Sequence, residues 1–111
     1  MLSGLRKIIF DGTVKILYLM IGETMYKFNE DKNLQELKTY IDDTYSEHYA
    51  SDKYQATDVI IDSGHGEGFA IGNIMKYAKR YGNKEGKNRK DLLKIIHYAI
   101  IMLHVHDTEN T

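Results

Sequence analysis

The spacing of apolar residues divides the chain into a short stretch with a strand pattern and a longer stretch with a helix pattern. Residues 5–10 and 14–20 are rich in β-formers and flank Asp11-Gly12, a dipeptide favoured in type I′ turns. A second glycine turn, Gly22-Glu23, precedes residues 24–28. We therefore predict an antiparallel β-meander of two to three strands within residues 1–28.

From residue 29 onward, apolar residues recur at spacings of three and four, as in amphipathic helices. The residues that mark the first predicted helix are Leu34, Leu37, Ile41 and Tyr45. Residues 54–62 fit a short helix that ends at Gly64, and a strand over residues 59–61 is the competing interpretation. The predicted fold class is α+β, with three to four helices in residues 29–111.

Two longer helices end the chain, one from Phe69 to a stop at Gly82 and one that begins at Arg89 or Asp91. The inward face predicted for the first consists of Gly72, Ile74, Met75, Ala78 and Tyr81. The inward face predicted for the second consists of Leu92, Leu93, Ile96, Ala99, Ile100 and Leu103. More apolar residues lie off this second face than a small domain can cover, so we expect a homo-oligomer with residues 100–105 at its interface.

The composition is that of an ordinary globular protein. A length of 111 residues fits a single domain over residues 1–111. The chain has no cysteine, which excludes disulfides, thiolate metal sites and cysteine nucleophiles. No apolar run approaches the roughly 18 residues of a membrane span, and no secretory signal is recognisable. We expect a protein of the cytoplasm that has no membrane partner.

Charge is distributed unevenly along the chain. Residues 1–62 hold 7 Lys or Arg and 11 Asp or Glu, whereas residues 63–111 hold 8 and 5. All eight of these basic residues lie within residues 76–94, where only Glu85 and Asp91 oppose them. A short basic segment on an acidic protein favours a local anion site over a broad nucleic-acid surface. A solvated helix face followed by a basic loop is the alternative.

Four polar residues within this segment are candidate ligand contacts. Asn73, Lys76, Tyr77 and Arg80 lie at spacings of three and four on one predicted helix. An amide, two cations and an aromatic ring are groups that together could hold the phosphate, ribose and base of a nucleotide. The glycines at 64, 66 and 68 precede this helix as in phosphate-binding loops, but the Walker lysine is missing, and a flexible link is the other interpretation.

We predict no metal, cofactor or catalytic site. His97 and His104 are two helical turns apart, about 11 Å, which is too far for one ion, so we expect His97 to be a packed or ligand-facing polar residue. Ser63, His65 and Glu67 are close in sequence but have no nucleophile elbow around them. The basic helices also carry too few carboxylates for a magnesium-dependent hydrolase.

The carboxy-terminal half resembles a group of small phage proteins. Residues 68–81 read GFAIGNIMKYAKRY and residues 91–98 read DLLKIIHY. Together they match the signature G-N-x-x-K-Y-x-x-R … D-L-x-K-x-x-x-Y, which is shared with nucleotide-kinase-like phage proteins of largely unknown function. The resemblance covers residues 68–98. A triphosphate cradle, which a kinase would need, is absent from the sequence.

The predicted layout, with a β-meander before these helices and an insert over residues 56–68, also resembles the type-one Thoeris anti-defence proteins of phages. Those proteins are oligomers that bind and sequester a cyclic ADP-ribose isomer made by a bacterial immune enzyme, without cleaving it. The resemblance implies a phage protein that acts in the cytoplasm of the host cell. It implies a homo-oligomer, a dimer or a higher assembly such as a hexamer, that binds a cyclic ADP-ribose-type signalling nucleotide.

Under this hypothesis each candidate residue has a role. Asn73, Lys76 and Arg80 contact phosphate and ribose, and Phe69 or Tyr77 stacks on a base. Arg89 closes the pocket from the basic loop. The alternatives that stay open are a nucleotide kinase or other nucleotide-metabolising enzyme, and a small nucleic-acid-binding protein whose affinity would fall steeply with salt.

Overall fold

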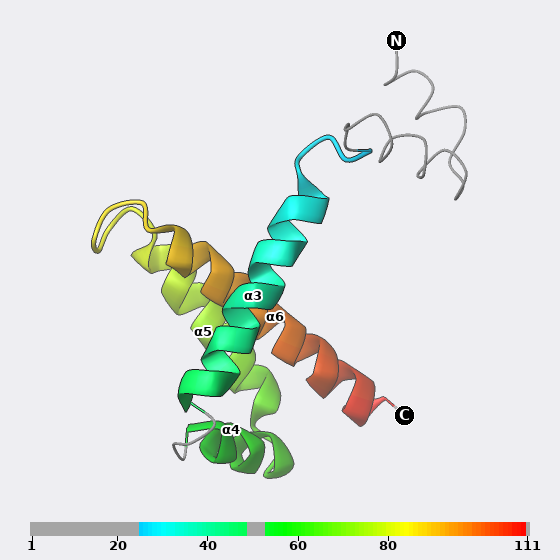
Figure 1. Cartoon of the computed structure of the whole chain (residues 1–111). Coiled ribbons are helices and arrows are strands. Elements are labelled where there is room, and N and C mark those ends of the chain that lie inside the picture. The colour runs from blue at the N-terminus through cyan, green and yellow to red at the C-terminus, as the bar shows by residue number, and fades with distance from the viewer. Residues whose placement is uncertain (1–24, 49–52, 111) are drawn as a thin grey trace. The chain divides into compact units, whose positions relative to one another are not determined.

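All the secondary structure that the computed structural model describes is helical (Figure 1). The described residues are 25–48 and 53–110, and the chain divides into two compact units, Met1–Glu36 and Leu37–Thr111. The helices are α3 (Glu30–His48), α4 (Lys53–Asp62), α5 (Gly66–Arg80) and α6 (Arg89–Glu109). The predicted α+β class is therefore wrong for the described residues, which contain no strand. Residues 1–24, which hold most of the predicted β-meander, lie outside them.

The segment expected to form the third strand instead leads into α3. The backbone N–H of Phe28 donates to Oε1 of Glu30 at 2.7 Å, and Nδ2 of Asn33 donates to the carbonyl of Phe28 at 3.3 Å. Asn29, at φ 58°, turns the chain into the helix. These local bonds satisfy backbone groups at the helix start, so a helix-initiation signal overrides the weak strand pattern there.

The joint between α4 and α5 follows the glycine that the sequence singled out. Gly64 adopts φ +90°, its N–H donates to Ile61 O, and the N–H of His65 donates to Ile60 O, both at 3.0 Å. This is the Schellman pattern that ends a helix on a left-handed glycine. The predicted stop at Gly64 is confirmed, and the competing strand over residues 59–61 is wrong.

A short loop joins α5 and α6 into an antiparallel hairpin (Figure 1). Gly82, at φ +83°, donates its N–H to Gly86 O at 2.9 Å, which closes the loop. Asn88 caps α6, because its Oδ1 accepts from the N–H of Lys90 at 3.0 Å. The predicted stop at Gly82 is confirmed, and of the two predicted starts, Arg89 and Asp91, the helix begins at Arg89.

The buried faces of the hairpin are not the ones that the apolar pattern predicted. On α5 the buried residues are Gly66, Ala70 and Tyr77, and on α6 they are Asp91 and Val105. Met75, Leu92, Ile96, Ile100 and Leu103 are exposed although the pattern placed them inward. Tyr77, which was assigned to the polar face, packs inside. The reason is that small residues on α5 let the helices approach closely on that side, and a tyrosine ring can be buried with its polar tip still solvated.

Gly66 offers a direct test of this close approach. A Cβ added there would lie 2.8 Å from Cγ2 of Val105 and 3.3 Å from Cγ1 of Ile61. Gly66→Ala should lower the free energy of unfolding by about 1–3 kcal/mol, because Val105 is buried and has little room to move. Gly68→Ala is the matched control, since nothing lies within 4 Å of its Cβ. It should stabilise the helix by up to about 1 kcal/mol. Urea denaturation of both variants would contradict this packing if they behaved alike.

Candidate functional site

Three cationic side chains surround the ring of Tyr77. Nζ of Lys76 lies 4.5 Å from the ring centroid, Nζ of Lys94 lies 4.8 Å away, and Cζ of Arg80 lies 5.3 Å away. Lys76 and Arg80 come from the last turns of α5, whereas Lys94 comes from the second turn of α6. Hairpin pairing therefore brings together charges that are far apart in the sequence. We call Lys76, Tyr77, Arg80, Lys94 and Tyr98 the Tyr77 cluster.

The ring of Tyr98 completes this cluster. It stacks on Tyr77 with a centroid distance of 6.0 Å and an interplanar angle of 13°, and it meets Phe69 edge-on at 5.8 Å. Tyr77 is only 9% exposed as a result. The stacked rings form a rigid base against which the cationic side chains are held.

The electrostatics of Tyr77 report the strength of the local positive field. Burial by itself raises the pKa of its hydroxyl, but the hydrogen bond with Lys76 and the charges of Lys94, Lys76 and Arg80 lower it. Together the hydrogen bond and the cations outweigh the effect of burial, so the pKa of the Tyr77 hydroxyl lies below its ordinary value. Within the described part of the chain, no carboxylate forms an ion pair with these cations, and the ion pair found there joins Lys38 to Asp42 on α3. The cluster can therefore offer its positive charge to an anion.

Asp91 is a buried carboxylate one turn before Lys94 on α6. It is 3% exposed, and its Oδ2 has no hydrogen-bond partner among the described residues. A buried polar atom without a partner is costly, and in native proteins it is commonly satisfied by a bound water or ligand. The hydroxyl of a ligand is a group that could supply this bond.

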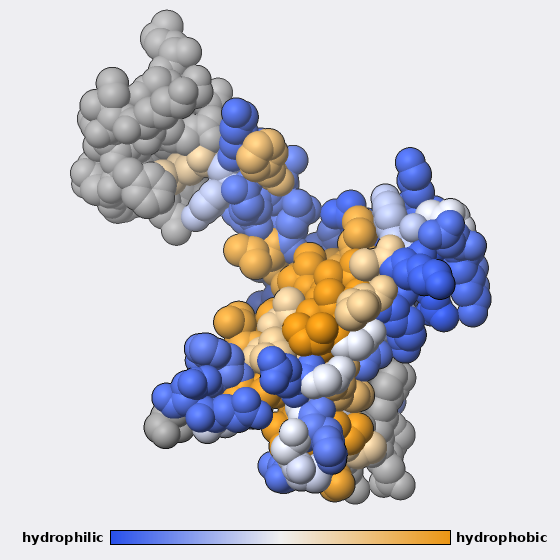
Figure 2. Space-filling model, turned by 180° about the vertical axis from the view of Figure 1, so that it is seen from behind, coloured by the Kyte–Doolittle hydropathy of each residue, from blue (hydrophilic) through white to orange (hydrophobic). Residues whose placement is uncertain are grey.

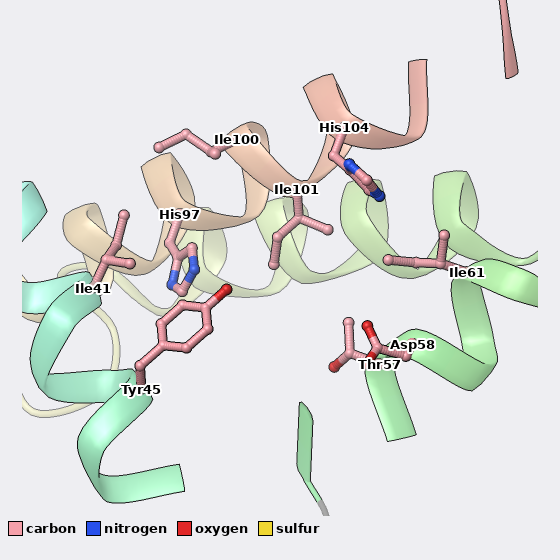
Figure 3. Close-up of a pocket in the computed structure, with 9 residues that line it drawn as sticks. All are labelled: Ile41, Tyr45, Thr57, Asp58, Ile61, His97, Ile100, Ile101 and His104. Carbon is pink, nitrogen blue, oxygen red and sulfur yellow. The ribbon is translucent and has the colours of Figure 1, made fainter. Parts of the chain in front are cut away.

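A cavity of about 380 Å³ opens on the same segment of α6. Figure 3 shows side chains from three helices converging on it, among them Tyr45 from α3, Asp58 from α4 and His97 from α6. The remaining lining residues are Ile41, Thr57, Ile61, Ile100, Ile101 and His104. Apolar walls with a few polar groups, at this volume, are typical of small-molecule sites.

His97 connects this cavity to the Tyr77 cluster. Its ring lies 6.4 Å from that of Tyr98, which belongs to the cluster, and meets the ring of Tyr40 edge-on at 6.2 Å. Burial lowers the pKa of His97 below its ordinary value. The imidazole is therefore neutral at pH 7, and it can both donate and accept a hydrogen bond toward the cavity.

This pKa shift predicts a pH dependence of stability. Because the native pKa lies below the ordinary value of 6.5, the unfolded chain takes up the His97 proton first as the pH falls. The contribution of His97 to stability is complete above about pH 6.5 and is lost as the pH falls through the native pKa. His97→Gln removes this titration, so its free energy of unfolding should decline less between pH 7 and pH 5. Parallel curves for the two proteins in urea denaturation would contradict the assignment.

The predicted site residues occupy different surroundings. Lys76, Tyr77 and Arg80 meet in the Tyr77 cluster. Phe69 is half-buried against Tyr98, and the Nδ2 of Asn73 donates to the carbonyl of Phe69 at 2.9 Å. Arg89 is exposed and is the first residue of α6, not part of the preceding loop.

Sequence reasoning placed no site role on several residues that the structure brings in. Lys94 and Tyr98 belong to the Tyr77 cluster, and Asp91 lies beside Lys94 on α6. The signature D-L-x-K-x-x-x-Y contains all three, so the motif was the available signal. The periodicity placed Tyr45 on the apolar side of its helix without a site role, and nothing in it pointed to Asp58; both residues line the cavity.

Two further properties concern the described residues as a set. No group of three or more His, Asp or Glu side chains among them is arranged to hold a metal ion. None of their helices combines the length and the apolar character that crossing a bilayer requires.

The comparison with protein families decides the classification. Residues 44–100, more than half of the chain, match the model of a family described as a protein of unknown function (DUF3310). The chain belongs to the DUF3310 family. The matched range contains the whole Tyr77 cluster, Asp91 and His97. No curated protein and no solved structure matches this DUF3310 chain.

Proposed function

We propose that this chain binds a phosphate-bearing nucleotide at the Tyr77 cluster and holds it without cleaving it. The observation that carries the proposal is the convergence of Lys76, Arg80 and Lys94 within 5.3 Å of the centre of one tyrosine ring. Three cations on one rigid base, with no carboxylate of the described residues paired to them, favour an anionic ligand over a structural role.

A phosphate fits this arrangement better than a carboxylate does. Arg80 presents a planar fork for two phosphate oxygens, whereas Lys76 and Lys94 act as point charges from both helices of the hairpin. Three cations match the charge of a diphosphate or a nucleotide more closely than that of a single carboxylate. Phosphate is therefore the part of the ligand assigned to the cluster.

The neighbouring cavity suits the rest of a nucleotide. Its apolar walls and the neutral His97 could take a base, and Asp58 could accept a hydrogen bond from a base N–H. His97 lines the cavity and Tyr98 belongs to the cluster, and these consecutive residues of α6 have ring centroids 6.4 Å apart. A ligand that carries both a base and phosphates would use both sites at once.

The most specific form of the proposal comes from the resemblance to type-one Thoeris anti-defence proteins, although most of the predicted β-meander that supports this resemblance falls on residues 1–24, outside the described residues. The chain would sequester a cyclic ADP-ribose isomer in the cytoplasm of a phage-infected bacterium and so block an immune signal. Sequestration needs cations, rings and a cavity but no nucleophile or general base. The residues of the Tyr77 cluster and the cavity fit that requirement.

The test is to find what the protein retains. Purified protein is incubated with a panel of linear nucleotides, cyclic nucleotides and cyclic ADP-ribose, freed of unbound ligand and denatured by heat. Mass spectrometry then identifies what is released. We expect one intact nucleotide in an amount close to that of the protein.

Two other outcomes would overturn the proposal. A chemically altered nucleotide, or phosphate moved from one nucleotide to another, would indicate a kinase or another nucleotide-metabolising enzyme. Retention of none of the panel, together with salt-sensitive binding of an oligonucleotide, would indicate a nucleic-acid-binding protein.

A further inference from the structure

Among the described residues, Asp91 is the one charged side chain that is buried. It is 3% exposed, and its Oδ2 has neither contact with solvent nor a hydrogen-bond partner among those residues. The first turn of a helix favours a carboxylate, and Glu67 holds such a place on α5, but Glu67 is exposed. The start of α6 therefore accounts for an acid at residue 91 and does not account for its burial.

Asp91 belongs to the side of α6 that faces α5. Lys94 and Tyr98, three and seven residues after it, both contact the ring of Tyr77 on α5. Val105, seven residues after Tyr98, lies next to the first residue of α5. Spacings of three and seven keep residues on one side of a helix. Asp91 therefore continues this side by one turn beyond Lys94, toward the loop of the hairpin.

Arg80 occupies the matching position on α5. It lies three residues after Tyr77, and Asp91 lies three residues before Lys94, so in this antiparallel hairpin both are one turn nearer the loop. Within the described residues Asp91 nevertheless forms no ion pair with Arg80, whose guanidinium lies over the Tyr77 ring. The phosphate site assigned to Arg80 thus ends at the level of a buried acceptor that is unpaired.

We propose that Asp91 accepts a hydrogen bond from a sugar hydroxyl of the bound nucleotide, an inference that rests on the proposed function. A carboxylate repels phosphate and can only accept hydrogen bonds, so the part of the ligand beside Asp91 must be a donor. In a nucleotide the donors nearest the phosphates are the hydroxyls of the sugar that carries them. Three residues of helix advance about 4.5 Å, so the step from Lys94 to Asp91 is comparable with the width of one sugar ring.

The burial of Oδ2 favours a hydroxyl over a metal ion at this position. A hydroxyl needs room for one oxygen atom, whereas magnesium usually keeps several waters when it binds through a single carboxylate. The surface at the loop end of the hairpin is hydrophilic, as Figure 2 shows, and residues 82–87 are all exposed. A sugar therefore meets polar surroundings there, and its hydroxyl supplies the charge-assisted hydrogen bond that Asp91 lacks.

The first experiment compares nucleotides with and without sugar hydroxyls. Isothermal titration in the presence of EDTA measures how the full chain binds the four ribonucleoside triphosphates and their 2′,3′-dideoxy counterparts. For the base that binds most tightly, loss of the hydroxyls should weaken binding about 10- to 100-fold, the range of a hydrogen bond to a charged group. Equal affinity within each pair would overturn the role of Asp91 and leave the proposed function standing. If no nucleotide of these pairs binds, the inference fails as well, and the release experiment alone then decides the proposed function.

Substitution of Asp91 shows whether this residue makes the distinction. Asp91→Ala should reduce the preference for the hydroxyl-bearing nucleotide to less than about 2-fold, because the acceptor is gone. Asp91→Asn keeps a neutral acceptor oxygen in the same place, so it should retain a preference of about 2- to 10-fold. A preference that persists unchanged in Asp91→Ala would assign the hydroxyl to another residue.

Glu67→Ala is the matched control, because it also removes a carboxylate from the first turn of a helix, but an exposed one. It should leave the preference between the nucleotides unchanged. Without ligand, Asp91→Ala should lower the midpoint of urea denaturation no more than Glu67→Ala does, since the carboxylate oxygen that it removes has no partner to lose. A much larger drop would mean that this carboxylate serves the fold, and it would overturn the proposal.

Discussion

Arg80→Ala is expected to weaken nucleotide binding by about 10- to 100-fold while the protein stays folded. The guanidinium lies 5.3 Å from the Tyr77 ring and is the one group of the cluster that can hold two phosphate oxygens in a fixed geometry. Hydrogen bonds to charged groups contribute about 1.5–3 kcal/mol each, which sets the expected range. Isothermal titration with the nucleotide that the release experiment identifies, and with ADP as a second probe, measures the loss.

A matched pair of lysines on α5 separates the cluster from general positive charge. Lys76 and Lys79 are both exposed, but only Lys76 lies over the Tyr77 ring, at 4.5 Å. Lys76→Ala should weaken binding about 10-fold, whereas Lys79→Ala should change it less than about 2-fold after correction for ionic strength. Equal losses would mean that the ligand senses only the net charge of the helix. Normal binding by Arg80→Ala would move the site elsewhere.

Tyr77→Ala should cost about 3–5 kcal/mol of unfolding free energy, the largest effect on stability that we expect from any single substitution. The ring is 9% exposed, stacks on Tyr98 and carries three cations around it, so its removal leaves a hole between α5 and α6. Because the described residues bury few side chains, such a loss is a large fraction of the about 5–15 kcal/mol that is typical of domain stability. Urea denaturation followed by circular dichroism measures it.

Tyr77→Phe is the control for this substitution. It keeps the stacked ring and loses the hydroxyl that Lys76 bonds, so it should cost about 1 kcal/mol or less. If Tyr77→Ala were as stable as Tyr77→Phe, the ring would not be part of the interior. The pair thus separates the packing of the ring from the chemistry of its hydroxyl.

Local signals placed most ends of the helices well, but α5 begins at Gly66, so Gly66 and Gly68 belong to the helix and not to the glycine-rich loop predicted before Phe69. Gly64 and Gly82 end helices because their backbones adopt the left-handed conformation, and Asn88 caps α6 with its side chain. Each of these helix ends depends on residues that are close in the sequence, so a sequence pattern can predict it. The predicted third strand was wrong because of local signals as well. The hydrogen bonds of Phe28 with Glu30 and Asn33 are a stronger local signal than the weak strand pattern of residues 24–28.

The grouping of residues in the Tyr77 cluster was predicted in part. The spacing of three and four put Lys76, Tyr77 and Arg80 on one helix, and the structure places all three together. The motif D-L-x-K-x-x-x-Y contains Lys94 and Tyr98, but sequence reasoning assigned these residues no role. Their role depends on the pairing of α6 with α5, which the motif does not show. The cavity could not be predicted at all, since its lining comes from α3, α4 and α6.

The sequence by itself determined where the helices of residues 29–110 lie, because helix periodicity, glycine stops and caps are local properties of the chain. Only the tertiary structure decided which faces are buried. Met75 and Leu103 are apolar but exposed, and Tyr77 and Asp91 are polar but buried. The physical reason is that burial depends on the shape of the facing helix. The small residues Gly66 and Ala70 bring α5 close to α6 along one side, whereas Met75 and Leu103 stay exposed.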